Sequence, residues 1–279
     1  MNKTKSTYSK RISFYFISLL PLLTPLAQAN ELTLPIQSDV INVNQPAISI
    51  IIDDMGYRLK SGQRAVNLPG DITYSFLPHA PHVNQLTQRA HEQNKEVMLH
   101  LPMEAVAGKK LGPGGLTECM TEKKFVKVLE SSINSIPHVS GFNNHMGSRL
   151  TKSPLWMKRL MQEVATDKKL FFVDSKTTSD SVAFKVARAE GLNSIQRDIF
   201  IDHEDSKSFI QKQLRKLIKK AQQNGTALAI AHPKKNTLSE LELWLPELKK
   251  QGIKLVSVSK LIRLKQQRKL ALWKKSAQQ

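Results

Sequence analysis

Short apolar runs alternate with amphipathic stretches along most of the sequence, and this alternation constrains the fold more than any other feature. Runs rich in apolar and β-branched residues predict strands at 47–52, 72–77, 96–101, 139–142, 170–173, 226–231 and 254–258. Helical spacing predicts helices at 83–93, 122–133, 154–167, 206–223 and 238–251. Strands that alternate with helices favour a mostly parallel sheet covered by helices. An open doubly wound sheet and a closed barrel both satisfy the pattern.

Acidic and histidine side chains end or directly follow five of the predicted strands. They are the pair Asp53 and Asp54, then His100, His145, Asp174 and His232. In either architecture the carboxyl ends of parallel strands form the functional site. One aspartate at such a position is ordinary, because aspartate also caps helices and makes turns. Asp174 could instead cap a helix, and His232 before Pro233 could instead shape a turn. Five such strand ends together nevertheless favour a functional site.

Six segments resemble the divergent polysaccharide deacetylase family. They are IIIDDMGY, EVMLHLPME, GFNNHMGSRLT, FFVDSKT, QRDIFID and ALAIAHP, in this order between Ile48 and His232. The family is similar to the carbohydrate esterase deacetylases, whose fold is an irregular (β/α) barrel of about seven strands. The resemblance, and not the periodicity, therefore implies an α/β barrel.

The resemblance also implies roles for individual residues. Asp53 corresponds to the general base, Asp54 to a ligand of a divalent metal, and His232 to the acid that protonates the leaving amine. In QRDIFID, Arg197 and Asp198 either orient the base or a ligand, or form a structural pair.

One position departs from the family's pattern of two metal-binding histidines four residues apart. His100 occupies the first position, but Glu104 occupies the second. Either Glu104 supplies an oxygen ligand, or His145 completes the set. We favour His145, because one aspartate with two histidines suits zinc or a similar divalent ion.

The chemistry that the resemblance implies for these residues is hydrolysis of an amide. A metal with an open position lowers the pKa of bound water to about 7 and polarises the carbonyl, while a carboxylate removes the proton during attack. We therefore expect a metal-dependent deacetylase, a hydrolase of carbon–nitrogen bonds other than peptide bonds, acting on acylated envelope polysaccharide or a peptidoglycan-type glycan. The alternative is a non-catalytic glycan-binding or scaffolding protein with the same barrel.

The N-terminal residues predict export to the periplasm. Lys3, Lys5, Lys10 and Arg11 precede an apolar run at 12–23, and Ala27-Gln28-Ala29 offers small residues for cleavage. The apolar run is shorter than the roughly 20 residues of a spanning helix. We expect a signal peptide at 1–29, a polar linker at 30–45 and the deacetylase-like domain at 46–262.

A basic tail at 263–279 ends the chain. The formal net charge is +19, and no acidic residue follows Glu247. Such a segment is attracted to anionic phospholipid, lipopolysaccharide, wall polymer or nucleic acid, and export makes nucleic acid an unexpected partner. The alternative is a solvated helical end that keeps the protein soluble.

Overall fold

The computed structural model of the protein describes residues 45–106, 108–167 and 170–277. The expected signal peptide at 1–29 lies outside these residues, as does the expected linker except for its last residue. Within the described ranges, no helix is both long enough and apolar enough to cross a membrane.

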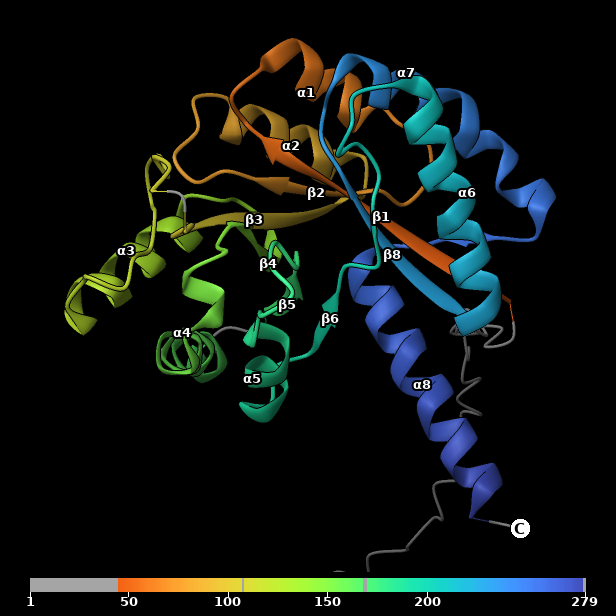
Figure 1. Cartoon of the computed structure of the whole chain (residues 1–279). Helices are drawn as coiled ribbons and strands as arrows, with labels where there is room; N and C mark the ends of the chain where they lie inside the picture. The colour runs from red at the N-terminus through yellow and green to blue at the C-terminus, as the bar shows by residue number, and fades with distance from the viewer. Residues whose placement is uncertain (1–44, 107, 168–169, 278–279) are drawn as a thin grey trace, which may run out of the picture. The chain divides into compact units, whose positions relative to one another are not determined.

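A single parallel sheet forms the centre of the domain (Figure 1). Its strands are β1 (Ala47–Met55), β2 (Thr73–Phe76), β3 (Glu96–Met103), β4 (Val139–Met146), β5 (Phe171–Asp174), β6 (Ser194–Gln196), β7 (Ile199–Phe200), β8 (Thr226–Ala231) and β9 (Lys254–Leu255). The order across the sheet is β6-β5-β4-β3-β2-β1-β8-β7, and β9 pairs with β1. Parallel pairing throughout agrees with the alternation of strands and helices in the sequence.

One short segment brings the two ends of this strand order together. β6 pairs with β5, β7 pairs with β8, and only Arg197 and Asp198 separate β6 from β7. The backbone N–H of Arg197 donates to the carbonyl of Asp174, and that of Asp198 donates to the carbonyl of Leu228. The sheet therefore curls into the irregular (β/α) barrel that the family resemblance implied, with β6 and β7 sharing one place in it.

Helices follow most of the strands and cover the outside of the curled sheet (Figure 1). They are α1 (Leu59–Val66), α2 (Val83–Glu92), α3 (Glu122–Asn134), α4 (Pro154–Asp167), α5 (Ala183–Ala189), α6 (Lys207–Asn224), α7 (Lys235–Trp244) and α8 (Val258–Ser276). The ends of α6 follow the sequence signals: the Ser206 hydroxyl accepts from the Phe209 N–H, and Gly225 ends the helix with φ +76°.

The C-terminal part differs from the sequence-based prediction. The helix expected at 238–251 begins earlier and ends at Trp244, because Pro246 has no N–H to continue the hydrogen-bond ladder. The strand expected at 254–258 stops at Leu255, and α8 starts at Val258. Alternating apolar residues at 253–258 resembled a strand, whereas Val258, Leu261 and Ile262 have helical spacing and are buried. The expected tail at 263–279 continues α8 as far as Ser276.

The sheet separates two apolar layers. On β1, Ile48, Ile50 and Ile52 pack toward the outer helices, whereas Ala47 and Ile51 face the barrel interior. The inner layer is completed by the first half of α8, whose buried residues are Val258, Leu261, Ile262 and Leu264. The start of α8 lies at the amino ends of the strands, where the Val258 N–H donates to the Thr73 hydroxyl. Helix α8 therefore closes the amino end of the barrel.

Two truncations test how much of α8 the fold needs. A chain ending at Gln266 keeps the buried residues of α8 and loses mainly the hydrogen bond from Arg268 to the Gln45 carbonyl, which is worth about 1 kcal/mol. We expect its thermal midpoint to fall by only about 2–4 °C.

A chain ending at Lys260 is the matched control. It also loses Leu261, Ile262 and Leu264, which are at most 4 % exposed, at about 1.5–3 kcal/mol each. We expect this chain to lose its cooperative thermal transition. Equal stability of the two truncated chains, measured by circular dichroism, would contradict the role of α8 in closing the barrel.

Candidate metal centre

Strand alternation brings the polar residues to the inner face of the barrel at its carboxyl end. Asp53 follows Ile51 on the inner face of β1, and His100 follows Met98 on that of β3. Residue His145 lies opposite Pro102 in the β3–β4 register. β4 runs to Met146, so His145 is the second-to-last residue of a strand and does not lie in the loop that the sequence suggested.

A break in β1 turns the second aspartate toward the same region. Simple alternation would put Asp54 on the outer face, opposite to Asp53. Asp54 has φ +56°, and the register with β2 shifts between Ile52 and Met55. Aspartate tolerates this left-handed conformation better than most residues. The local irregularity therefore places both carboxylates at the site, and such bulges commonly re-aim a functional side chain.

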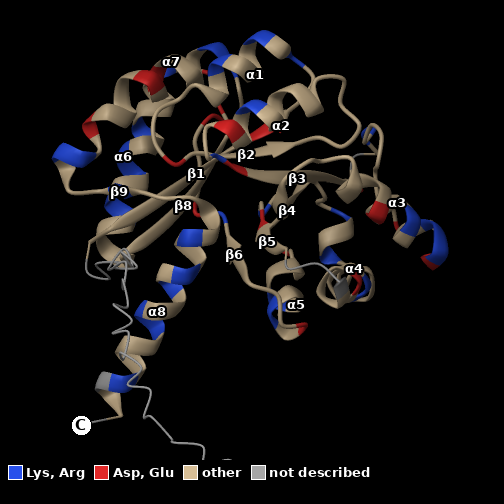
Figure 2. Ribbon diagram, turned by 180° about the vertical axis from the view of Figure 1, so that it is seen from behind, with Lys and Arg blue, Asp and Glu red and all other residues tan. Residues whose placement is uncertain are grey.

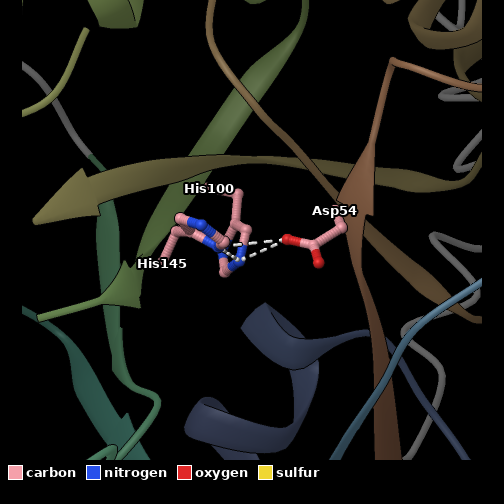
Figure 3. A group of neighbouring side chains, drawn as sticks. All are labelled: Asp54, His100 and His145. Atoms are coloured by element: carbon pink, nitrogen blue, oxygen red, sulfur yellow. Dashed lines mark hydrogen bonds and ion pairs between the residues drawn. The ribbon is translucent and has the colours of Figure 1, made fainter. Parts of the chain in front are cut away.

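Three donor atoms converge at this position (Figure 3). The Asp54 Oδ1 atom lies 3.1 Å from His145 Nδ1 and 3.3 Å from His100 Nε2, and the two nitrogens are 3.1 Å apart. Burial alone would raise the pKa of Asp54, but the two imidazoles lower it well below its usual range. The Oδ1 atom is buried and accepts no well-directed hydrogen bond from the described residues. One carboxylate oxygen and two imidazole nitrogens in such proximity fit a divalent metal such as zinc.

The side-chain amide of Asn143 holds this arrangement from inside the barrel. Its Nδ2 donates to both carboxylate oxygens of Asp53 at 3.0 Å and to the Ser175 hydroxyl at 3.1 Å. Its Oδ1 accepts from the Ser75 hydroxyl at 2.6 Å and from Nδ1 of His100 at 2.9 Å. Because Oδ1 is only an acceptor, the proton of His100 lies on Nδ1 and Nε2 faces the cluster. Fixing the tautomer of a ligating histidine through its other nitrogen is typical of metal sites.

The buried charges affect one another strongly. Burial raises the pKa of Asp53, against the opposing effect of His100. Burial disfavours the imidazolium of His100, but the Asp53 and Asp54 carboxylates outweigh it and raise its pKa to about 9. The cluster therefore attracts positive charge, which a proton or a metal ion can supply.

A third histidine, His232, directly follows β8 and faces Asp54. Nε2 of His232 lies 3.8 Å from Asp54 Oδ2, and its Nδ1 is 2.9 Å from Oδ1 of the buried Asp202. Asp202 also accepts from the Thr237 hydroxyl and from the backbone N–H of His232. Burial disfavours the charged form of His232, but Asp202 raises its pKa above the usual value. Asp202 lies in the segment QRDIFID but was not among the predicted site residues, unlike Arg197 and Asp198 of the same segment.

Glu104 lies outside the cluster. Its Oε2 accepts from the Glu118 N–H at 2.8 Å, and its Oε1 is 3.6 Å from Nε of Arg149. The carboxylate is thus used to hold the segment before α3, and His145 stands beside Asp54 and His100 instead.

Three other predicted candidates have local structural contacts. The carboxylate of Asp174 accepts from the Lys176 N–H and the Ser181 hydroxyl, so it shapes the turn after β5. Arg197 and Asp198 do not pair with each other in the described structure. Arg197 donates to the carbonyls that follow β5, and Asp198 accepts from the Leu228 N–H.

A cavity of about 490 Å³ opens beside the cluster. Its lining includes the polar side chains of Asp54, Tyr57, Arg58, His145, His232 and Lys234. Asp53 does not line it and is 2 % exposed. A ligand in this cavity therefore meets Asp54, His145 and His232 directly, whereas Asp53 lies behind them.

The sequence model of the divergent polysaccharide deacetylases matches residues 50–262, which contain every residue of this site. The chain belongs to the divergent polysaccharide deacetylase family.

Two relatives and two solved structures are similar to the chain. An uncharacterized protein of Haemophilus influenzae is 35 % identical over 219 residues, which are 78 % of each chain. The uncharacterized Escherichia coli protein YibQ is 32 % identical over 215 residues, 77 % of this chain and 67 % of its own. A crystal structure of an uncharacterized Agrobacterium tumefaciens protein matches 78 % of this chain and 89 % of its own, with TM-score 0.75 and 24 % identity. The peptidoglycan deacetylase PdaC of Bacillus subtilis shares the fold, with TM-score 0.51 and 14 % identity over 85 % of this chain and 99 % of its own.

Replacement of single side chains tests the candidate metal site of this member of the divergent polysaccharide deacetylase family. We expect His145→Ala and Asp54→Ala no longer to retain one zinc ion per chain. Their zinc affinity should fall by more than the roughly 10- to 100-fold that the loss of an outer-sphere partner costs. Metal content after dialysis, measured by mass spectrometry, and zinc titration calorimetry check the result.

Glu104→Ala is the matched control, because it removes a carboxylate from the position where the family's second histidine is expected. We expect this variant to retain zinc with unchanged affinity. Loss of zinc in Glu104→Ala together with its retention in His145→Ala would overturn the ligand set.

Proposed function

We propose that the protein is a metal-dependent deacetylase that hydrolyses N-acyl groups on cell-envelope glycans. The observation that carries this proposal is the meeting of two arrangements at one cavity. The donor atoms of Asp54, His100 and His145 lie together, and His232 faces Asp54 with its second nitrogen bound to Asp202. A metal site beside a carboxylate-oriented histidine is suited to hydrolysis of an amide.

Asp54 Oδ1, His100 Nε2 and His145 Nδ1 would hold the metal, which we propose to be zinc. A metal there supplies an activated water and polarises the substrate carbonyl. The network of Asn143 keeps His100 in the required tautomer and prevents its ring from rotating.

Asp53 is proposed to remove the proton of the attacking water. Its Oδ2 lies 3.6 Å from the ligating nitrogen of His100, so the carboxylate is next to the ligand set. Its raised pKa increases its affinity for a proton near neutral pH, as a general base requires.

His232 is proposed to protonate the leaving nitrogen. An amine is a poor leaving group unless it receives a proton as the carbon–nitrogen bond breaks. The bond to Asp202 holds the ring, directs Nε2 toward the cavity, and raises the fraction of imidazolium at neutral pH. The proton passes from Nε2 to the substrate nitrogen, the carbon–nitrogen bond breaks, and the acyl group is released as a carboxylic acid.

A peptidoglycan-type glycan is the proposed substrate. The family acts on polysaccharides, and the structurally similar PdaC is named as a peptidoglycan deacetylase. The cavity provides an exposed aromatic ring at Tyr57, 46 % exposed, of the kind that packs against sugar rings.

A non-catalytic glycan-binding protein is the second candidate. The observation that favours it is the position of Asp53. Both of its carboxylate oxygens accept hydrogen bonds from Nδ2 of Asn143, and the residue does not line the cavity. Release of acetate from N-acetylated glycan distinguishes the two functions, since both allow metal and glycan binding.

Substitution of the two proposed proton-transfer residues tests catalysis. We expect Asp53→Asn to retain zinc and to reduce acetate release by about 10²- to 10⁴-fold. We expect His232→Ala to retain zinc as well, with the largest loss of rate on substrates whose amine is the poorest leaving group. Coupled-enzyme detection of acetate and metal analysis of the same samples check both outcomes.

Asn143→Leu separates a chemical role of Asp53 from a positional one. It leaves the Asp53 carboxylate in place and removes the amide that binds it. If Asp53 is the base, Asp53→Asn loses rate at full zinc occupancy, whereas Asn143→Leu loses rate together with zinc affinity. Undiminished turnover in Asp53→Asn would show that Asp53 is not the base.

We also propose that the mature protein works in the periplasm, where its basic C-terminal segment meets an anionic envelope surface. The basic residues, apolar run and small-residue pattern of the first 29 residues support export.

Cleavage of the signal peptide is directly measurable. We expect mass spectrometry of the periplasmic fraction to give an N-terminus at Asn30, because Ala27-Gln28-Ala29 precedes it. Replacement of Ala27 and Ala29 by bulky residues should block processing. A chain that retains Met1 in the membrane fraction would contradict the proposal.

A further inference from the structure

The exposed end of α8 combines apolar and basic side chains. Leu270, Leu272 and Trp273 are 52 %, 68 % and 64 % exposed, and they lie within four consecutive positions. Elsewhere in the described chain, the large exposed apolar residues Tyr57, Val106, Leu155 and Leu243 lie singly. Scattered exposed apolar residues are ordinary, but a group of them indicates an interaction surface.

We infer that the segment Lys265–Lys274 of α8 docks on a lipid bilayer that contains anionic phospholipid. The exposed basic residues Arg263, Lys265 and Lys269 precede the three apolar side chains along the helix, Lys274 follows them, and α8 has no acidic residue. Figure 2 shows this basic helix extending away from the sheet. Leu270 and Trp273 are three residues apart and share one face of the helix, whereas Leu272 points to another side. Segments that bind at the bilayer interface combine basic residues with Leu and Trp.

The chemistry of the segment favours a bilayer over other anionic partners. A wall polymer or another polyanion satisfies the lysines but leaves Leu270, Leu272 and Trp273 in water. A second copy of α8 covers the apolar side chains but brings like charges together. Of these three partners, only a bilayer offers both negative headgroups and an apolar phase within the diameter of one helix.

The rest of the structure suits docking on a bilayer through the end of α8. The first half of α8 is buried at the amino end of the barrel, through Val258, Leu261, Ile262 and Leu264, so the projecting half is attached to a rigid support. The cavity beside Asp54 opens at the opposite, carboxyl ends of the strands. A chain docked through α8 therefore presents its cavity away from the bilayer. This inference does not depend on whether the cavity is catalytic.

Co-sedimentation of the full mature chain with vesicles tests the inference. We expect binding to vesicles of phosphatidylcholine mixed with phosphatidylglycerol, and little binding to phosphatidylcholine alone. Replacement of Leu270, Leu272 and Trp273 by Ser should weaken binding at least about tenfold, since it removes the apolar part of the interaction. Lys269→Gln with Lys274→Gln should also weaken it and reduce its sensitivity to salt.

Matched controls use residues of equal exposure or charge elsewhere on the surface. Leu155→Ser and Leu243→Ser, at sites 71 % and 73 % exposed, should leave vesicle binding unchanged, and so should Lys216→Gln on α6. The fluorescence of Trp273 should shift to shorter wavelength on addition of anionic vesicles, and Trp273→Phe should abolish that shift.

Three results would overturn the inference. The first is equal binding of the triple Ser variant and the wild type, which would show attraction by charge alone. The second is the absence of binding to anionic vesicles. The third is a concentration-dependent dimer that the triple Ser variant abolishes, which would assign the segment to a second copy of the chain.

Discussion

The amide of Asn143 is the interaction on which the site depends. It lies inside the barrel on β4 and makes hydrogen bonds to Asp53 on β1, Ser75 on β2, His100 on β3 and Ser175 after β5. One side chain thus sets the relative positions of five consecutive segments of the sheet. An amide is suited to this place because it donates to a carboxylate and accepts from an imidazole at the same time. Asn143 is fully buried, so a donor or acceptor left without a hydrogen-bond partner there would lower the stability of the fold by about 1–3 kcal/mol. The network therefore holds the ligand atoms firmly.

The two ends of the barrel have separate tasks. At the carboxyl end, alternation along the strands directs Asp53, His100 and His145 inward, and the left-handed backbone of Asp54 adds the remaining carboxylate. At the amino end, buried apolar side chains of α8 fill the barrel interior and exclude water from it. The inward-facing residues therefore change from apolar to polar along the barrel axis, and the buried charges lie where a cavity reaches them.

Much of this could be predicted from the sequence, and the exceptions have physical causes. Buried parallel strands are long apolar runs, so β1, β3 and β8 were found, and with them the aspartates and histidines at their ends. Asn143 and Asp202 were not selected, because an amide or a carboxylate acquires its role only from partners distant in sequence. The boundary between β9 and α8 was misplaced, since a few alternating apolar residues fit a strand and a helix equally well. The choice of a barrel came from the family resemblance, because closure depends on two residues between β6 and β7.

We infer that Asp54, His100 and His145 together hold one metal ion. An anomalous difference map from a crystal grown with zinc, recorded on both sides of the zinc absorption edge, tests it most directly. We expect one strong peak about 2.0–2.2 Å from Asp54 Oδ1, His100 Nε2 and His145 Nδ1. A peak at Glu104 instead, or no peak near Asp54 in crystals of protein that releases acetate, would contradict it.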